Sequence, residues 1–213
     1  MSKASYHHGD LKNALLDAAD ELLAEEGLQG FTLRACARKA GVSHAAPKHH
    51  FNDVRGLLTA VAERGFQRLV DILVEELKAA KGDLEEEMHA TATAYIRFAE
   101  GFPEHFRVMF RDDLLQTDRT NPPCSVIDTF TELTNVILRQ RGEPEIAPGG
   151  ADYVNNPDLV NDIILGWTFI HGYAHLKLEG QMAIVPEEMH AGQIRRAAVR
   201  LSRLIGSRAD TAA

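Results

Sequence analysis

The chain has few cysteines and no long apolar run, and both absences limit what it can be. Only Cys36 and Cys124 occur among 213 residues, with no Cys-x-x-Cys pair. A disulfide framework is therefore excluded, and a cysteine-type structural zinc site is not expected. The apolar stretch Ile163–Ile170 is interrupted by Gly166 and Thr168, so it is too short to span a membrane. The first nine residues lack the apolar centre of a signal peptide, and the expected location is the cytoplasm.

Strand-like alternation is also missing, whereas apolar residues recur at helical spacing almost throughout. The first helical run starts near Leu11 and is ended by Gly27 and Gly30. Further helices are expected at 33–39, 44–51, 53–81, 84–101, 103–111, 123–140, 157–179 and 186–206. The Gly- and Pro-rich stretch 142–156 predicts a loop, which we expect to be mobile. The fold class is all-α: a three-helix head (1–52), a connecting helix (53–82) and a larger C-terminal helical bundle (83–213).

The net charge of −8 is distributed unevenly along this chain. Residues 30–58 contain five basic residues and one acidic residue, whereas residues 67–213 contain 15 basic and 23 acidic residues. A local charge of +4 therefore sits beside an acidic body. Because partners respond to the local field rather than to the total, the head is suited to a polyanion.

The segment from Thr32 to Ser43 has the features of a helix-turn-helix. Thr32 is expected to cap the first helix, Ala37 leaves room at the helix crossing, and Gly41 suits a left-handed turn. Ser43 is expected to cap the second helix. In a helix-turn-helix the start of this second helix enters the DNA major groove. Here its first residues are His44, Ala45 and Ala46.

At these residues the N-terminal stretch resembles the tetracycline-repressor (TetR) family of bacterial regulators. The matching residues are Gly27, Phe31 to Arg34, Ala40 to Ser43, His49 to Phe51, Leu57 and Leu58. A second match resembles the C-terminal domain of a TetR subgroup named for its Trp and His-Gly residues. It comprises Tyr95 to Ala99, Pro103, Phe106 to Phe110, Gly166, Trp167, His171 to Ala174, and Leu178 to Gly180.

The resemblance implies a DNA-binding transcriptional regulator that is not an enzyme and requires no cofactor. It places Thr32, Ser43, Lys48 and His49 on phosphates and His44, Ala45 and Ala46 at bases. We add Arg34 to these expected DNA contacts, because it belongs to the basic cluster of residues 30–58. From the residues alone, the two alanine methyls can touch thymine methyl groups but cannot hydrogen-bond a base. His44 is then the only polar base reader at the helix tip, so DNA shape is expected to contribute to specificity.

Three positions in the head depart from the family pattern or from ordinary helix chemistry. The family usually has Tyr at the position of Lys48 and a basic residue at the position of Val54, with Arg55 as a candidate substitute. Pro47 removes the N–H of an early intrahelical bond, which predicts a tightened 3₁₀ start. We therefore expect DNA recognition, but not an operator sequence shared with other family members.

The resemblance also implies a homodimer on a palindromic operator, released by a small effector. The interface is expected on helices 157–179 and 186–206, with the small and apolar residues Ile163, Ile164, Ile170, Ala174, Ala197, Ala198, Leu201 and Leu204. An effector pocket is expected among aromatic and Met side chains, and it favours a largely apolar ligand. Its candidate residues are Tyr95, Phe98, Phe102, Phe106, Met109, Phe110, Trp167 and His171. For His171, the residues alone favour a core histidine that is hydrogen-bonded within the protein over a donor to the ligand.

Three other interpretations compete with this one. A helix–Gly–helix segment can be a plain corner without any DNA function. The pairs Glu86/His89 and Glu187/His190 have the Glu-x-x-His spacing of di-iron helix bundles, but their polar surroundings argue against buried ligands, and no metal site is expected. A helical ligand-binding protein without DNA binding is the third interpretation, and the unusual head residues are its support.

Overall fold

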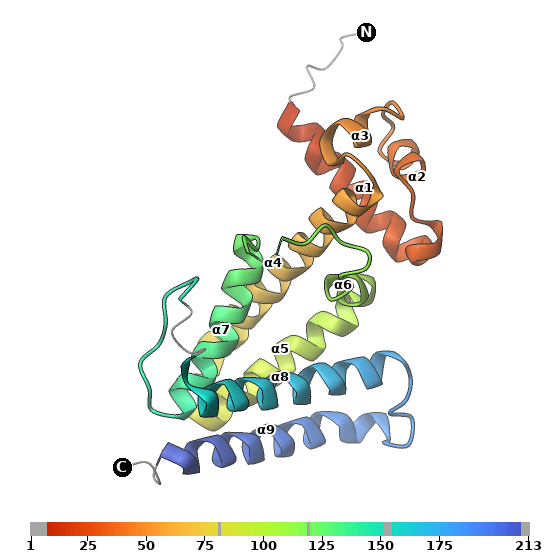
Figure 1. The fold of residues 1–213 in the computed structure, drawn as a ribbon. Coiled ribbons are helices and arrows are strands. Elements are labelled where there is room, and N and C mark those ends of the chain that lie inside the picture. The colour runs from red at the N-terminus through yellow and green to blue at the C-terminus, as the bar shows by residue number, and fades with distance from the viewer. Residues whose placement is uncertain (1–7, 81, 119, 151–154, 210–213) are drawn as a thin grey trace. The chain divides into compact units, whose positions relative to one another are not determined.

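The computed structural model describes residues 8–80, 82–118, 120–150 and 155–209, and none of these lies in a strand (Figure 1). The helices are α1 (His8–Gly30), α2 (Leu33–Lys39), α3 (Ala46–Phe51), α4 (Val54–Ala80), α5 (Leu84–Gly101), α6 (Pro103–Met109), α7 (Cys124–Gln140), α8 (Pro157–Leu178) and α9 (Glu187–Ala209). The expected all-α fold is confirmed, and α2 and α5 have the bounds that the sequence predicts. Residue 81, at the expected end of the connecting helix, lies outside the described part. No described helix is long and apolar enough to cross a membrane.

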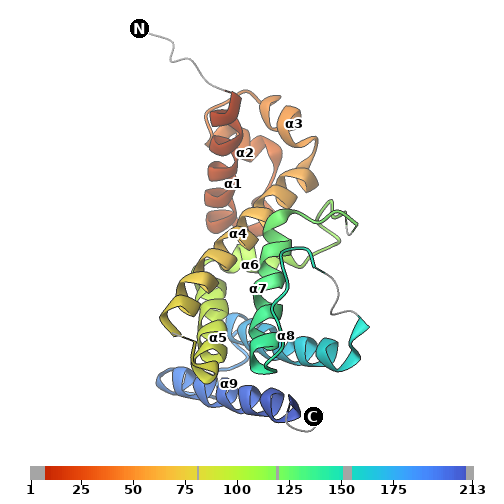
Figure 2. The same cartoon turned by 90° about the vertical axis from the view of Figure 1, so that its left-hand side faces the viewer.

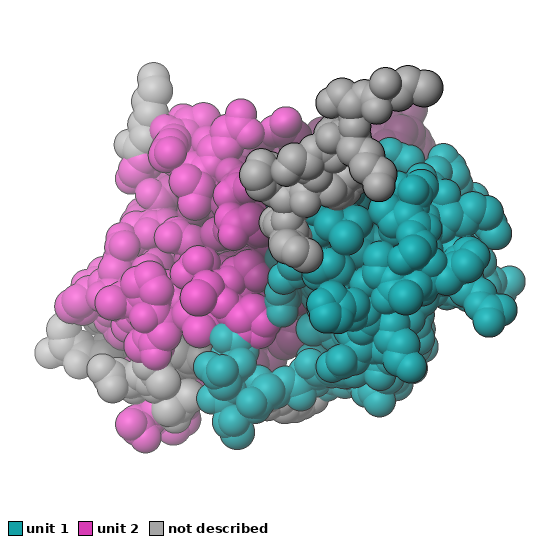
Figure 3. Space-filling view, turned by 90° about the horizontal axis from the view of Figure 1, so that it is seen from above, with its two compact units in different colours: residues 1–65, 104–122 teal, residues 66–103, 123–213 magenta. Residues whose placement is uncertain are grey.

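Two compact units make up the chain, and Figure 3 colours them separately. Unit 1 combines residues 1–65 with 104–122, and unit 2 combines residues 66–103 with 123–213. The boundary between the two units falls inside α4, within the connecting helix expected at residues 53–82. Segment 104–122 belongs to the N-terminal unit because it contacts α1 and α4 through side chains that are far apart in sequence.

In unit 1, α1, α2 and α3 pack against one another, as both views of the ribbon show (Figures 1 and 2). α1 is kinked at Gly27, where φ is +63°, at the place where the sequence predicted the first run to end. On α6, the buried His105 has its Nε2 atom 3.0 Å from Asp20 Oδ1 of α1. The other Asp20 oxygen accepts a hydrogen bond from Arg64 of α4 at 3.0 Å. This network connects α1, α4 and α6 within the unit.

In unit 2, α5 packs against α7, α8 and α9, and it buries Tyr95 and Phe98 almost completely. A buried ion pair joins the end of α7 to α8: Arg141 Nη1 lies 2.5 Å from Asp162 Oδ2, and the Asp162 side chain is only 1% exposed. Loss of one partner from such a pair leaves a charge uncompensated in the interior. The pair therefore connects the C-terminal end of α7 to α8.

The loop after α7 is held in place over its described part, residues 141–150. The Asn135 side chain accepts a hydrogen bond from Ile146 N at 2.9 Å and donates one to Ile146 O at 3.1 Å. Arg139 binds Glu145 at 2.9 Å. The predicted loop is confirmed over this part, and an amide on α7 satisfies the loop backbone at Ile146. Residues 151–154 of the expected loop lie outside the described chain.

Candidate nucleic-acid interface and apolar pocket

The first helix of the motif begins and ends as the sequence predicts. Thr32 has extended backbone angles, and its Oγ1 accepts a hydrogen bond from Ala35 N at 3.1 Å, which caps α2. Because the hydroxyl only accepts here, its proton remains able to donate to a phosphate. Gly41 has φ +67°, and Val42 N donates to Ala37 O at 3.0 Å. The predicted left-handed turn is confirmed, and Ala37 is fully buried at the crossing.

The start of the second helix differs from the prediction. α3 begins at Ala46 rather than His44, and Ser43 does not cap it with its side chain. Ser43 O instead accepts from Ala46 N at 3.0 Å, which is an i→i+3 turn. The reason is Pro47, which cannot donate the i→i+4 bond that would extend the helix backwards. The expected tightening of this start is therefore confirmed, while the role of Ser43 as an N-cap is corrected.

The residues expected to contact DNA lie on the outside of unit 1. Seven of them are exposed and Ala46 is half-buried; the seven are Thr32, Arg34, Ser43, His44, Ala45, Lys48 and His49. On the same two helices, Cys36, Pro47 and Phe51 are buried. The alternation means that α2 and α3 have an inner face that packs the head and an outer face that is polar and basic. The outer face is able to lie against a phosphate backbone.

The basic residues of the head differ in how freely they can bind a phosphate, because some of them already bind other groups of the protein. Lys39 Nζ lies 2.8 Å from Glu25 and 3.2 Å from Glu21 of α1, and these carboxylates raise the pKa of Lys39. Arg55, the candidate substitute for the missing basic residue at Val54, donates through Nη2 to Leu115 O at 2.5 Å. The guanidinium of Arg55 is thus engaged within unit 1, which the sequence did not indicate.

The junction between α3 and α4 is unusually tight. Asn52 has φ +63° and ψ −60°, and Asp53 N donates to Phe51 O at 2.8 Å. A β-carbon at Gly56 would lie only 2.0 Å from Phe51 O. Because side chains rarely adopt the Asn52 conformation, the junction stores backbone strain that its surroundings must hold. It determines how α3 is presented relative to α4.

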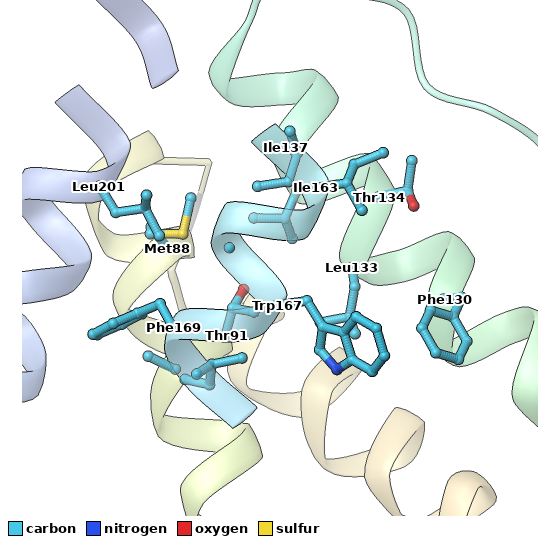
Figure 4. A pocket seen from close by; sticks show the side chains of 14 residues that line it. Met88, Thr91, Phe130, Leu133, Thr134, Ile137, Ile163, Trp167, Phe169 and Leu201 are labelled. Atoms are coloured by element: carbon cyan, nitrogen blue, oxygen red, sulfur yellow. The ribbon is translucent and has the colours of Figure 1, made fainter. Parts of the chain in front are cut away.

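Unit 2 contains a small apolar pocket of about 50 Å³ (Figure 4). Its lining residues are Met88, Thr91, Ala92, Phe130, Leu133, Thr134, Val136, Ile137, Ile163, Gly166, Trp167, Phe169, Ile170 and Leu201. They come from α5, α7, α8 and α9, and none of them is charged. The α7 residues of this lining recur at helical spacing. From the sequence, that spacing predicted the helix at 123–140 but was not interpreted as a pocket wall.

Of the eight residues expected at the effector pocket, Trp167 lines this cavity. Tyr95, Phe98, Phe102 and His171 also belong to unit 2, whereas Phe106, Met109 and Phe110 belong to unit 1. There Met109 is buried on α6, and its sulfur would be 2.6 Å from a β-carbon at Gly65. Helical spacing identified side chains that face inward, but it did not indicate in which of the two units they are packed.

His171 is satisfied within the protein. Its Nδ1 lies 2.8 Å from the hydroxyl of the buried Tyr95, and Trp167 forms a side-chain hydrogen bond to the same Tyr95. Burial, with a smaller contribution from His175, lowers the pKa of His171. Burial also raises the pKa of Tyr95. A neutral histidine hydrogen-bonded to a neutral phenol supports the core-histidine interpretation.

The Glu-x-x-His pairs form ordinary ion pairs and packing contacts. Glu86 binds Arg195 of α9, and Glu187 has a 79% exposed side chain. His190 Nδ1 lies 2.5 Å from the Tyr173 hydroxyl. Within the described residues, no group of three or more His, Cys, Asp or Glu is arranged to hold a metal ion.

The faces of α8 and α9 expected to form an interface are only partly exposed. Ile164 and Leu204 are 51% and 49% exposed, and Ile163 and Ala197 are half-buried. The remaining four expected residues are buried inside the subunit: Ile170, Ala174, Ala198 and Leu201. Those four residues belong to the core of unit 2. The candidate interface is therefore limited to the expected residues that are exposed, Ile164 and Leu204.

Comparison with known protein families gives two matches that together cover most of the chain. Residues 15–61 match the model described as bacterial regulatory proteins, tetR family. Residues 88–200, more than half of the chain, match the model described as tetracyclin repressor-like, C-terminal domain. The first match contains the helix-turn-helix, and the second contains every pocket residue except Leu201.

Relatives extend over nearly the full length. The uncharacterized HTH-type transcriptional regulator YvkB of Bacillus subtilis is 26% identical over 174 residues, covering 82% of this chain and 87% of that protein. A protein of unknown function from Rhodococcus sp. RHA1 is 29% identical with a TM-score of 0.71, covering 94% and 98%. A TetR-family transcriptional regulator from Streptomyces coelicolor shares the fold, at 18% identity, TM-score 0.61 and coverage of 93% and 99%. The chain belongs to the TetR family of DNA-binding transcriptional regulators.

Proposed function

We propose that the chain is a homodimeric repressor that is released from a palindromic operator by a small apolar effector. The observation that supports this most strongly is the outer face of α2 and α3, where the expected contact residues are exposed together. Ala45 and Ala46 offer methyl groups to thymine, and His44 offers a hydrogen bond to a base edge. Thr32, Arg34, Ser43, Lys48 and His49 are the phosphate contacts.

The test is selection of random duplex DNA on the purified protein, followed by a salt titration of the selected duplex. We expect a palindrome whose half-sites are about 34–36 Å apart, the spacing of successive major grooves. Its affinity should fall steeply as salt rises, because cationic side chains displace counterions. Weak binding without enrichment would favour the alternative, a helical ligand-binding protein without a DNA function.

Two substitutions on the outer face should have different signatures. Replacing His44 by Ala should cost about 1–3 kcal/mol of operator binding and relax the sequence preference at one position of each half-site, with the salt slope unchanged. Replacing Lys48 by Ala should weaken binding to all sequences and reduce the salt slope by about one. Anisotropy titrations on the operator and on single-position variants measure both. Identical profiles for the two variants would refute the division into base and phosphate contacts.

The dimer surface is proposed on the exposed apolar side chains of α8 and α9. Ile164 and Leu204 are each about half exposed, at 51% and 49%. Leu176 and Met189, on the same two helices, are 39% and 45% exposed. Large exposed apolar side chains that recur along neighbouring helices are typical of a protein–protein interface. A two-fold four-helix contact would bury them together.

The effector is proposed to enter the pocket of unit 2. A lining without charged residues favours an uncharged, apolar or aromatic molecule. The cavity of about 50 Å³ is well below the roughly 300–1,000 Å³ of ordinary ligand sites. The ligand must therefore displace side chains of α7 or α8, and this differential fit provides the free energy for releasing DNA.

The single tryptophan of the chain, Trp167, lines this pocket and reports on it directly. Replacing Leu201 by Ala should enlarge the cavity enough to admit benzene, because apolar cavities of this origin bind it. We expect a benzene-dependent shift of Trp167 emission and a rise in melting temperature of a few degrees, with weaker operator binding.

The matched control is Leu73→Ala, which truncates a buried leucine of unit 2 that does not line the pocket. It should lose similar stability, and benzene bound in the cavity left by Leu73 should leave Trp167 emission unchanged, because Trp167 lines the other pocket. A benzene response of equal size in both variants would mean that the pocket has no special role.

A further inference from the structure

Two consecutive residues between α6 and α7 bind the first turns of α4. Gln116 Nε2 donates to Asp53 Oδ1 and Oδ2 at 3.0 and 3.1 Å, and Gln116 N donates to Thr59 Oγ1 at 2.8 Å. Arg55 donates to Leu115 O at 2.5 Å. We call these contacts of Leu115 and Gln116 with α4 the latch. In Figure 2 the green segment after α6 lies beside the start of α4.

The latch is ordered from both sides. Leu115 is only 3% exposed, so its side chain anchors the segment in unit 1. Before it, Arg111 binds Asp113 through two hydrogen bonds of 2.7 Å. After it, Asp118 accepts from the Thr120 backbone N at 2.9 Å. These local contacts restrict the segment before Gln116 binds α4. Gln116 therefore loses less conformational entropy when it forms its hydrogen bonds to α4.

The group that Gln116 binds is the cap of α4. Asp53 Oδ1 accepts from Gly56 N at 2.9 Å, so this carboxylate fixes where α4 begins. Asp53 directly follows the strained Asn52, one residue after the end of α3. Backbone conformations of this kind cost about 1–3 kcal/mol and persist only where neighbouring contacts hold them. The latch provides such contacts from outside the helix-turn-helix.

We infer that Gln116 is a positioning residue for DNA recognition, which holds the α3–α4 junction through Asp53 and so sets the presentation of α3. The inference rests on the proposed DNA-reading role of α3. Gln116 itself adds no charge to the outer face, so its contribution is geometric. Its loss should affect the fit to a specific base sequence and leave the phosphate attraction unchanged.

The test variant is Gln116→Met, which preserves the length of the side chain and removes its hydrogen bonds to Asp53. The matched control is Gln67→Met, because Gln67 Nε2 donates to Asp71 Oδ1 at 2.9 Å in another exposed Gln–Asp contact on α4. We expect Gln116→Met to weaken operator binding about tenfold, with affinity for random DNA, the salt slope and the melting temperature unchanged. The control should match the wild type in all four.

Hydrogen exchange of residues 44–58, measured without DNA, is the second readout. It should be faster in Gln116→Met and unchanged in Gln67→Met. Unchanged exchange together with unchanged operator affinity would overturn the inference, as would an equal loss of specific and random DNA binding. A wild type that selects no operator, combined with faster exchange in the variant, would contradict the proposed function and leave the latch supported.

Discussion

Replacing Gly56 by Ala is expected to weaken operator binding by about 5- to 150-fold, because overpacking of this kind costs roughly 1–3 kcal/mol and here displaces the DNA-reading helix itself. The added β-carbon would lie 2.0 Å from Phe51 O, an atom of the α3 backbone. A backbone carbonyl cannot turn aside as a flexible side chain does. The α3–α4 junction must therefore open, which moves α3 relative to α4.

The control for this substitution is Gly101→Ala, at the last residue of α5. A β-carbon there meets no atom within 4 Å, and the residue is helical. Alanine should therefore stabilise by roughly 0.4–1 kcal/mol through the unfolded chain. Operator affinity should not change, since Gly101 belongs to unit 2.

Anisotropy titration on the selected operator measures the effect, and circular dichroism reports the helical content. Trp167 emission follows unit 2 separately, so a local change in the head is distinguished from global unfolding. Operator affinity of Gly56→Ala within threefold of the wild type would show that the junction does not control α3.

Local rules predicted the parts of the head that depend on neighbouring residues. The Thr32 cap and the Gly41 turn follow from side-chain and backbone chemistry within four residues, and both are confirmed. The Ser43 cap failed because Pro47, four positions later, decides where α3 can begin. The error came from giving a capping preference more weight than a missing N–H.

Contacts between distant residues could not be predicted in the same way. Gln116 and Asp53 are 63 positions apart, and nothing in either local pattern indicates their pairing. The same holds for Asn135, whose amide binds the backbone of Ile146 in the loop that follows α7. The pocket was foreseen as aromatic and placed on Trp167, but its α7 wall depends on how α7 packs against α8.

Exposed apolar side chains on α8 and α9 lead to the second large effect. Replacing Ile164 by Asp should convert the proposed dimer to monomer, because a charge would be placed at the centre of an apolar contact. The substituted side chain is 51% exposed in the single chain, so the stability of the monomer should change by no more than about 0.5 kcal/mol. Leu201, which the sequence also placed at the interface, is unsuitable for such a test because it lines the pocket.

Operator binding should fall by about 10²–10⁴-fold in the monomer, because two linked heads bind with a high effective concentration that one head lacks. Sedimentation velocity measures the assembly, and Leu84→Asp is its control: Leu84 is also apolar and 43% exposed, but it lies on α5. Joining two Ile164→Asp chains by a flexible linker should restore most of the operator affinity, since the heads themselves are intact. A dimeric Ile164→Asp protein would exclude this face as the interface, and a monomer that still binds the operator tightly would show that DNA recognition does not require two heads.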